Sequence, residues 1–449
     1  MRTLRDSFGE VRISDDALWG IVTQRSLDLF KIGEESFPTS FLEAFSFIKE
    51  ASAMANFHLG TLDENRALAI RGACKTIRSH GLYEQFPLSI WQTGSGTHTN
   101  MNFNEVIVSL ASSEDLELHP NDHVNKSQST NDTFPAAMEL SILLEYDKSL
   151  KVAFDFYRKA LTDLLERAGD RIKIGRTHLQ DATPIYYKDV IGAWLASLDY
   201  HEKKIEEQLE ELLVLPLGAT AVGSGINAPM GYPEKVCEVL SGITGYNFRP
   251  ERSLPFGISL KSRVVSYHSA LTAFTRDLYK IIHDIRMLGS GPRCGLGELL
   301  LPENEAGSSI MPGKVNPSQI EALSMVCAKI FGHEETIGFS ASQGHFELNA
   351  MMPVMIYDIL RSSSLLAHGL YSFTKHCLMG IAFNDEVIKH HLEQSLMLVT
   401  ALSKHIGYEK AAAIAKLAHE KNMTLKEASL ETGLTDEDFD AWVDPHAMV

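Results

Sequence analysis

The amino-acid sequence predicts an all-α protein organised around a bundle of five long helices. Apolar residues recur every three or four positions in three stretches, which begin near Leu140, Ile191 and Val264. This spacing places an apolar seam along one side of each helix, as in a helix bundle. Two more long helices are expected at about 317–335 and 348–375, and no strand-rich region is visible. The seam is most regular in the third stretch, where it consists of Val264, Tyr267, Leu271, Phe274, Leu278, Ile281, Ile285 and Leu288.

At 449 residues the chain exceeds what one compact core usually holds, which indicates two or three domains. We predict an N-terminal, mostly helical domain at residues 1–127, with an irregular start and helices at about 41–55 and 63–79. The long-helix bundle is predicted at residues 128–383. Past Phe383 the helices shorten, which indicates a small C-terminal helical domain at residues 384–449.

Charge and composition narrow the class of partner. Lys and Arg number 41 and Asp and Glu 58, so the formal net charge is 41 − 58 = −17. This balance argues against nucleic acid or an anionic membrane surface as a partner. The five cysteines are scattered without metal-binding spacing, and there is neither an apolar signal core nor a membrane-length apolar run. We therefore expect a cytoplasmic protein that does not bind a membrane.

The stretch at residues 307–317 has the pattern of a mobile catalytic loop that leads into a capped helix. Gly307 and Gly313 leave the segment free to move. Asn316 is predicted to cap the following helix, with Pro317 at its first position and Gln319 closing a capping box. The result would be an anion site with a movable serine at the positive end of the helix dipole. An ordinary loop before a helix is the alternative interpretation.

Two other stretches combine hydroxyl and amide side chains. In residues 93–102, the glycines exclude a regular helix and expose backbone N–H groups that suit a carboxylate or a phosphate; the alternative is a Gly-Ser linker. In residues 119–132, Ser129, Thr130 and Asn131 are predicted to cap the long helix that follows Thr133, and they offer more donors than capping requires. His119 and His123 lack a third ligand at suitable spacing, so we expect no metal site there.

A third stretch, residues 175–184, forms a polar break between two apolar seams. His178 within it titrates near neutral pH and is the natural acid/base candidate, although a structural histidine is the alternative. Glu321 lies one turn inside the helix that follows the 307–317 loop. A buried carboxylate there would hold a histidine in one tautomer and raise its basicity. The sequence contains no set of metal ligands, no Walker loop and no dinucleotide-binding fingerprint. The donor loops, the histidine, the glutamate, the lysine and the movable serine together suit abstraction of a proton beside a carboxylate.

These motifs resemble those of the class II fumarases in the fumarase/aspartase superfamily, over nearly the whole chain. Residues 307–317 match the superfamily signature. The segments Ser318-Gln319-Ile320-Glu321-Ala322-Leu323 and Gly344-His345-Phe346-Glu347-Leu348-Asn349 are similar to the fumarase forms rather than the aspartase forms. Arg176-Thr177-His178 likewise has a histidine where aspartases have glutamine.

The resemblance implies a cofactor-free hydro-lyase that interconverts fumarate and L-malate in the citric acid cycle. Ser308 would take the C3 proton of malate, and His178, oriented by Glu321, would act on the hydroxyl through a water. Lys314 would complete the catalytic set. The residues implied in substrate binding are Ser95, Gly96, Thr97, Ser129, Thr130, Asn131, Thr177, Ser309, Val315 and Asn316. A second, non-catalytic anion site would correspond to His119, Pro120, Asn121 and Asp122.

The resemblance also implies an assembly, because in this family four subunits join their five-helix bundles into a twenty-helix core. Each active site then draws on three subunits. The sequence departs from the family at several positions: His98 replaces a glutamine, Leu116 stands in place of an arginine near the second anion site, and Lys188-Asp189 replaces a Gly-Gln pair. Two alternatives remain open, namely another lyase of the superfamily such as aspartate ammonia-lyase, and a catalytically silent helical scaffold.

Overall fold

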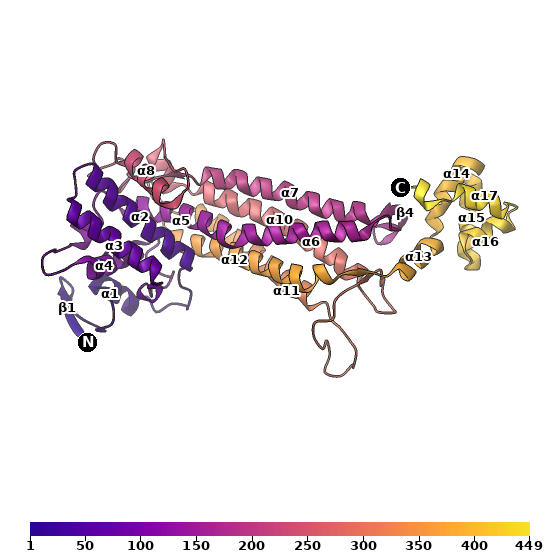
Figure 1. Ribbon diagram of the computed structural model, residues 1–449, viewed down its shortest axis with the longest axis horizontal. Coiled ribbons are helices and arrows are strands. Elements are labelled where there is room, and N and C mark those ends of the chain that lie inside the picture. The colour runs from indigo at the N-terminus through magenta and orange to yellow at the C-terminus, as the bar shows by residue number, and fades with distance from the viewer. The chain divides into compact units, whose positions relative to one another are not determined.

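The computed structural model describes residues 1–449, and helices make up most of it (Figure 1). The strands are short and pair only within four two-stranded sheets. The predicted all-α class is therefore confirmed. The chain divides into two compact units, described separately below. The first unit contains residues 1–152, 201–275 and 327–367, and the second contains residues 153–200, 276–326 and 368–449.

The first unit is built around α2, Thr39–His58, which packs against α3, α5 and α8. An aromatic cluster forms its centre, with the ring centroids of Phe41 and Phe134 4.9 Å apart and those of Phe45 and Phe103 4.7 Å apart. Burial of these rings fixes α2 against α5. The other elements of this unit are β1 Arg2–Asp6, β2 Gly9–Ile13, α1 Ile21–Leu29, α3 Glu64–Ser79, α4 Thr97–Ala111, α5 Thr130–Glu145, β5 Val214–Leu215, α8 Tyr232–Thr244, β6 Arg249–Pro250 and α9 Leu254–Ser259.

The long helices predicted from the apolar seams are present. They are α6 Lys151–Ala168, α7 Tyr187–Glu211, α10 Ser262–Leu288, α11 Ser318–Ala341 and α12 Met352–His376. All eight seam residues predicted on α10 are buried. In the apolar pattern that begins at Leu140 the polar Asp147 stands at one seam position, and there a π-helical turn, Tyr146–Leu150, separates α5 from α6. The spacing of three and four residues continues across this turn, so only the polar side chain of Asp147 interrupts the apolar pattern.

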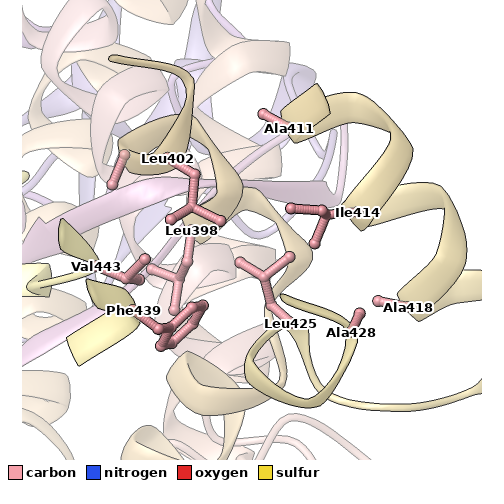
Figure 2. Packing of buried hydrophobic residues seen from close by; sticks show 10 residues of the cluster. Leu398, Leu402, Ala411, Ile414, Ala418, Leu425, Ala428, Phe439 and Val443 are labelled. Carbon is pink, nitrogen blue, oxygen red and sulfur yellow. The ribbon is translucent and has the colours of Figure 1, made fainter. Parts of the chain in front are cut away.

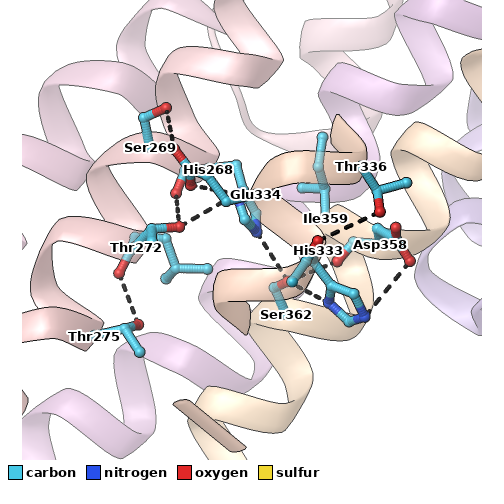
Figure 3. A network of polar contacts seen from close by, with 12 residues as sticks. His268, Ser269, Thr272, Thr275, His333, Glu334, Thr336, Asp358, Ile359 and Ser362 are labelled. Carbon is cyan, nitrogen blue, oxygen red and sulfur yellow. Dashed lines mark hydrogen bonds and ion pairs between the residues drawn. The ribbon is translucent and has the colours of Figure 1, made fainter. Parts of the chain in front are cut away.

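Within the first unit, a polar network joins α10, α11 and α12 (Figure 3). Ser362 Oγ lies 2.9 Å from both His268 Nε2 and His333 Nδ1. His268 Nδ1 lies 3.0 Å from Glu334 Oε2, and His333 Nε2 lies 3.6 Å from Asp358 Oδ1. The three helices are thus held by directional contacts as well as by apolar packing.

The second unit contains a β-hairpin that the sequence did not predict. Strands β3, Ile172–Thr177, and β4, Gln180–Tyr186, pair antiparallel where we expected a polar break. The two turn residues, His178 and Leu179, have φ angles of +58° and +60°. Such a turn normally carries Asn and Gly, so its sequence signal is missing here. Helix α13, Asp385–Gln394, packs on β3, and β7 Leu299–Leu300 pairs with β8 Ala382–Phe383.

The C-terminal helices of the second unit share a small apolar core (Figure 2). Leu402, Ile414, Leu425 and Phe439 lie at its centre and are almost fully buried. The helices are α14 Val399–Ile406, α15 Tyr408–Lys421, α16 Leu425–Glu431 and α17 Asp436–Trp442. The predicted domain boundaries, 1–127, 128–383 and 384–449, stay a prediction. None of the helices is both long and apolar enough to cross a membrane.

Candidate active site

The first donor loop runs through Gly94, Ser95 and Gly96 into the start of α4. The prediction that the glycines exclude a regular helix is wrong for residues 97–102, which form the first turns of α4. Gly96 precedes the helix with φ +78°, and a Cβ on it would lie 2.1 Å from the ring of Phe134. A Cβ on Gly94 would lie 1.5 Å from the carbonyl oxygen of Ala350. Close packing therefore requires glycine at both positions. Ser95 Oγ and Thr97 Oγ1 lie 2.8 Å apart, so the loop presents two hydroxyls together at the helix N-terminus.

The second donor loop begins α5. Ser129 is the N-cap in a complete capping box with Asp132, so α5 starts at Thr130 rather than after Thr133. Asp132 Oδ2 also accepts from the N–H groups of Gly218 and Thr220, at 3.1 and 2.9 Å. Burial raises the pKa of Asp132 to about 7, although these N–H groups act in the opposite direction. Asp132 thereby fastens a distant segment of the chain to the start of α5.

The structure brings the two donor loops together within the first unit. Asn100, on the first turn of α4, donates through Nδ2 to Thr130 Oγ1 at 3.0 Å. Asn131 Nδ2 donates to the carbonyl oxygen of Ala221 at 2.8 Å. The sequence offered the two loops as separate donor sets, whereas the structure joins them by side-chain hydrogen bonds. Together they form one surface of hydroxyl and amide donors, which suits a carboxylate.

His178 lies at the tip of the β3–β4 hairpin in the second unit, and it is exposed. The hairpin is held by Glu298, which is fully buried and accepts from Tyr187 Oη at 2.7 Å. Arg176 Nη2 lies 2.6 Å from the same carboxylate, on its other oxygen. Burial raises the pKa of Glu298, but Lys173, Tyr187 and Arg176 outweigh it and the pKa falls below its ordinary value. Sequence reasoning missed Glu298, because nothing in its local pattern distinguishes it.

The Ser308 loop is closed at its base by its own backbone. The N–H of Gly307 donates to the carbonyl of Lys314 at 2.9 Å. Ser308 Oγ accepts from the N–H groups of Ile310 and Met311, at 3.2 and 3.0 Å. Two N–H donors directed at one oxygen form an arrangement that stabilises negative charge. Most of the loop is exposed, including the Lys314 and Ser309 side chains.

The predicted capping box at the start of α11 is wrong. The helix begins at Ser318, and Asn316 Nδ2 instead donates to the carbonyl of Gly307 at 2.6 Å. Gln319 Oε1 accepts from the Ser372 hydroxyl at 2.8 Å rather than reaching back to the helix start. Asn316 therefore closes the loop that precedes the helix, because its amide meets a carbonyl across the loop base. Val315 beside it is half-buried.

Glu321 is not buried as predicted. Its side chain is 44% exposed, and its Oε1 lies 3.1 Å from Arg286 Nη2. Within one chain it therefore pairs with an arginine of α10 rather than with His178. No local pattern indicates this pairing, since the two residues are 35 positions apart. Thr177, next to His178, is exposed.

The remaining candidate residues lie in the first unit. His119 Nδ1 accepts from the N–H of Asp122 at 3.2 Å, and it lies 3.1 Å from Asp122 Oδ2. Asn121 is exposed and Pro120 half-buried in the same π-helical turn. His98 Nδ1 lies 2.9 Å from Ser26 Oγ, and burial lowers the pKa of His98. No group of three or more His, Cys, Asp or Glu side chains is placed to hold a metal ion.

Comparison with known proteins places this geometry in a family. A lyase family model matches residues 9–332, and a fumarase C C-terminus model matches residues 398–449. The class II fumarate hydratase of Bacillus subtilis (strain 168) is 47% identical over 455 residues, which cover 100% of this chain and 98% of the relative. The chain belongs to the class II fumarase family. The class II fumarate hydratase of Staphylococcus aureus (strain MRSA252) is 46% identical, with 100% and 99% of the two chains covered.

Solved structures agree with this assignment to the class II fumarases. The crystal structure of class II fumarase from Schistosoma mansoni matches with a TM-score of 0.96 and 36% sequence identity. The match covers 100% of this chain and 98% of that one. The fumarase resemblance seen in the sequence motifs is therefore confirmed, and so is the family fold.

Proposed function

We propose that this protein is a fumarate hydratase, a hydro-lyase that adds water across the double bond of fumarate to give L-malate, and the reverse, in the citric acid cycle. The observation that carries the proposal is full-length identity of 47% to a class II fumarate hydratase. The two joined donor loops support it, because they suit a carboxylate substrate. The cysteines are unpaired, which accords with a reducing, cytoplasmic setting.

The proposed roles are those that the resemblance to class II fumarases implies, and the contacts of Ser308 agree with its role. Ser308 takes the C3 proton of malate, and the N–H groups of Ile310 and Met311 stabilise its negative oxygen. His178 removes or delivers the hydroxyl through a water, with Glu321 as its support in the assembled enzyme. Lys314 and the donor residues bind the two carboxylates of the substrate. The donors are Ser95, Gly96, Thr97, Ser129, Thr130, Asn131, Thr177, Ser309, Val315 and Asn316.

We also propose a homotetramer whose active sites are shared among three subunits, around a twenty-helix core. Helix α11 supports this because one of its faces is apolar yet exposed in the single chain. Met325 and Phe339 on this face are 68% and 62% exposed, and Ala328 and Gly332 between them are small enough for close helix contact. Within this proposal the chain keeps three domains, at residues 1–127, 128–383 and 384–449.

The activity is tested with the purified protein and L-malate by following the absorbance of fumarate near 240 nm. Formation of fumarate from malate, with no ammonia released from aspartate, is the expected result. Ammonia release from aspartate would instead identify another lyase of the superfamily. Absence of both reactions would favour the catalytically silent scaffold.

The shared site is tested by mixing two inactive variants. Ser308→Ala and His178→Asn should each be nearly inactive, since each removes an acid/base group. If these two residues meet from different subunits, mixed tetramers contain some sites with both groups intact. Recovery of activity after reversible dissociation and mixing is expected. An active monomer in size-exclusion light scattering, or no recovery in tetramers shown to be mixed, would contradict the shared site.

A further inference from the structure

Lys49 on α2 is a buried lysine that the proposed chemistry does not use. Its side chain is fully buried, and its Nζ donates to Asn125 Oδ1 and Gln128 Oε1, both at 3.0 Å. Burial lowers the pKa of Lys49 to about 7, against the attraction of Asp132. A buried amine is costly to keep and usually has a carboxylate partner. Here the hydrogen-bond acceptors are two amide oxygens.

A lysine amine that donates to both amides fixes which way each amide points. Lys49 Nζ donates to the oxygen of each amide, and in its protonated form it cannot accept, so protonated Lys49 holds Asn125 and Gln128 with their oxygens toward it. The remaining contacts agree with this orientation. Gln128 Nε2 donates to the carbonyls of Val124 and Lys126, at 3.0 and 3.1 Å, and Asn125 Nδ2 donates to the carbonyl of Gln128 at 3.3 Å.

The same orientation extends from Asn125 to the second donor loop. Asn125 Oδ1 also accepts from Asn100 Nδ2, at 3.1 Å. Asn100 uses the second hydrogen of this amide to donate to Thr130 Oγ1, at 3.0 Å. Because the Thr130 oxygen accepts this bond, its own hydrogen remains available as a donor. Thr130 is 5% exposed, and a hydrogen bond from a group so shielded from water is strengthened.

We propose that Lys49 is a positioning residue that sets the direction of the hydrogen-bond chain Lys49–Asn125–Asn100–Thr130, so that Thr130 presents its O–H to a substrate carboxylate. Lys49 itself does not touch the substrate. The chain also ties α4, which carries the first donor loop, to the start of α5. This inference rests on the proposed function, because the carboxylate is that of fumarate or malate.

Two variants, Asn100→Asp and Lys49→Met, test the direction of this hydrogen-bond chain: the first reverses it and the second removes the group that sets it. In Asn100→Asp the carboxylate only accepts, so the Thr130 hydroxyl turns to donate to it and is lost to the substrate. In Lys49→Met the amides of Asn125 and Gln128 lose the donor that orients them. Both variants cost the substrate carboxylate its hydrogen bond from the Thr130 hydroxyl. Because this bond is to a charged group, we expect KM for malate to rise about tenfold or more. The value of kcat should change less than KM, because the contact exists in both the ground state and the transition state.

Two further variants make the test specific to direction. Asn125→Asp loses the long bond from Asn125 Nδ2 to the Gln128 carbonyl, but it still accepts from Lys49 and Asn100 and adds an ion pair with Lys49 that offsets the loss, so it should fold and keep KM within about threefold of wild type. Asn102→Asp changes another buried amide of α4, the helix that carries Asn100. Asn102 Nδ2 donates to the carbonyl of Gln85 and not to Thr130. This variant controls for a buried charge on α4, and any change in KM that it causes is subtracted.

The outcomes separate this inference from the proposed function. A wild-type enzyme with no activity on malate or fumarate refutes the function itself. With an active wild type, an unchanged KM in Asn100→Asp or in folded Lys49→Met overturns the positioning role. A tenfold rise of KM in Asn125→Asp overturns it as well, since that variant preserves the direction of the chain. If Lys49→Met does not fold, Asn100→Asp and Asn125→Asp decide the question.

Discussion

The two donor loops and the Ser308 loop are built in opposite ways. The donor loops are fixed by buried groups, since Asn100 bonds Thr130, Asp132 bonds two distant N–H groups, and a Cβ on Gly96 would meet Phe134. The Ser308 loop makes its hydrogen bonds to itself and is mostly exposed, and a Cβ on Gly313 would meet nothing within 4 Å.

This contrast suggests a division of labour in the proposed reaction. Groups that hold the substrate act best when they are preorganised, because no free energy is then spent on ordering them during binding. A base that must reach the substrate and then release the product benefits from a loop of low local stability. We therefore expect changes in the donor loops to affect the stability of the whole protein, and changes in the Ser308 loop to affect turnover.

The largest effect should come from Ser308→Ala. Removal of a general base costs on the order of 100-fold or more in kcat. The melting temperature should stay at the wild-type value, because the side chain contacts only its own loop. Steady-state kinetics and thermal unfolding of the same preparation test both statements. Exposed Ser342→Ala is a matched control, and wild-type turnover in Ser308→Ala would refute the assignment of the base.

Gly96→Ala should produce the largest loss of stability. The new methyl group would lie 2.1 Å from the ring of Phe134, which is fully buried among other aromatic rings. Overpacking, together with an alanine at φ +78°, is expected to cost about 3 kcal/mol. Chemical denaturation at fixed protein concentration measures this cost. A loss below about 1 kcal/mol would show that the donor loop is less rigid than its contacts indicate.

Apolar periodicity predicted the long helices well because each of them has to bury a continuous stripe. The α10 seam is buried at every predicted position, and even the irregularity at Asp147 coincides with a π-helical turn. The β3–β4 hairpin was missed because its turn residues, His178 and Leu179, are unusual at positive φ. Short strands with an atypical turn leave little signal against a helical background.

The candidate site was predictable in its residue types but not in its connections. Local patterns placed a helix cap among Ser129, Thr130 and Asn131, of which Ser129 is the N-cap, and they placed a glycine-rich donor loop before Thr97 but missed that residues 97–102 are helical. The bond between Asn100 and Thr130, which are 30 residues apart, depends on how α4 packs against α5. The predicted capping box at Asn316 was wrong for the same reason, since the Asn316 amide donates to the carbonyl of Gly307 across the base of the loop. Competition among tertiary partners is invisible to a local pattern.

The free energy of unfolding should fall at acidic pH because of His333, which lies in the first unit. Burial lowers the pKa of His333 to about 4, with Lys329, His268 and Arg361 contributing in the same direction. At pH values below 6.5, the ordinary pKa of this histidine, His333 takes up a proton in the unfolded chain but not in the folded chain. The free energy of unfolding therefore falls as the pH drops. Between pH 7.5 and pH 5 the loss from His333 amounts to about 2 kcal/mol.

The variant His333→Asn removes this contribution, so its free energy of unfolding should fall by about 2 kcal/mol less than that of wild type over the same range. Burial raises the pKa of neighbouring Asp358 to about 6, so uptake of a proton by that carboxyl opposes the loss. The readout is therefore the difference between wild type and variant, from denaturation at both pH values. Equal slopes in the two proteins would mean that His333 titrates normally in the folded state.

The smallest effect, and the sharpest test of the contrast between the loops, is expected from Gly313→Ala. Gly313 has φ +80°, so alanine there is strained by about 1 kcal/mol, but its methyl group meets no neighbour. Because the Ser308 loop makes its hydrogen bonds chiefly within itself, it can open without unfolding of the protein. The strain at residue 313 should therefore disfavour only the loop conformation seen in this structure. We expect a melting temperature within about 1 °C of wild type and a kcat lowered at most about fivefold, which corresponds to that strain. A melting temperature that fell as in Gly96→Ala, with kcat unchanged, would show that the Ser308 loop belongs to the folded framework and would remove the distinction between the two loops.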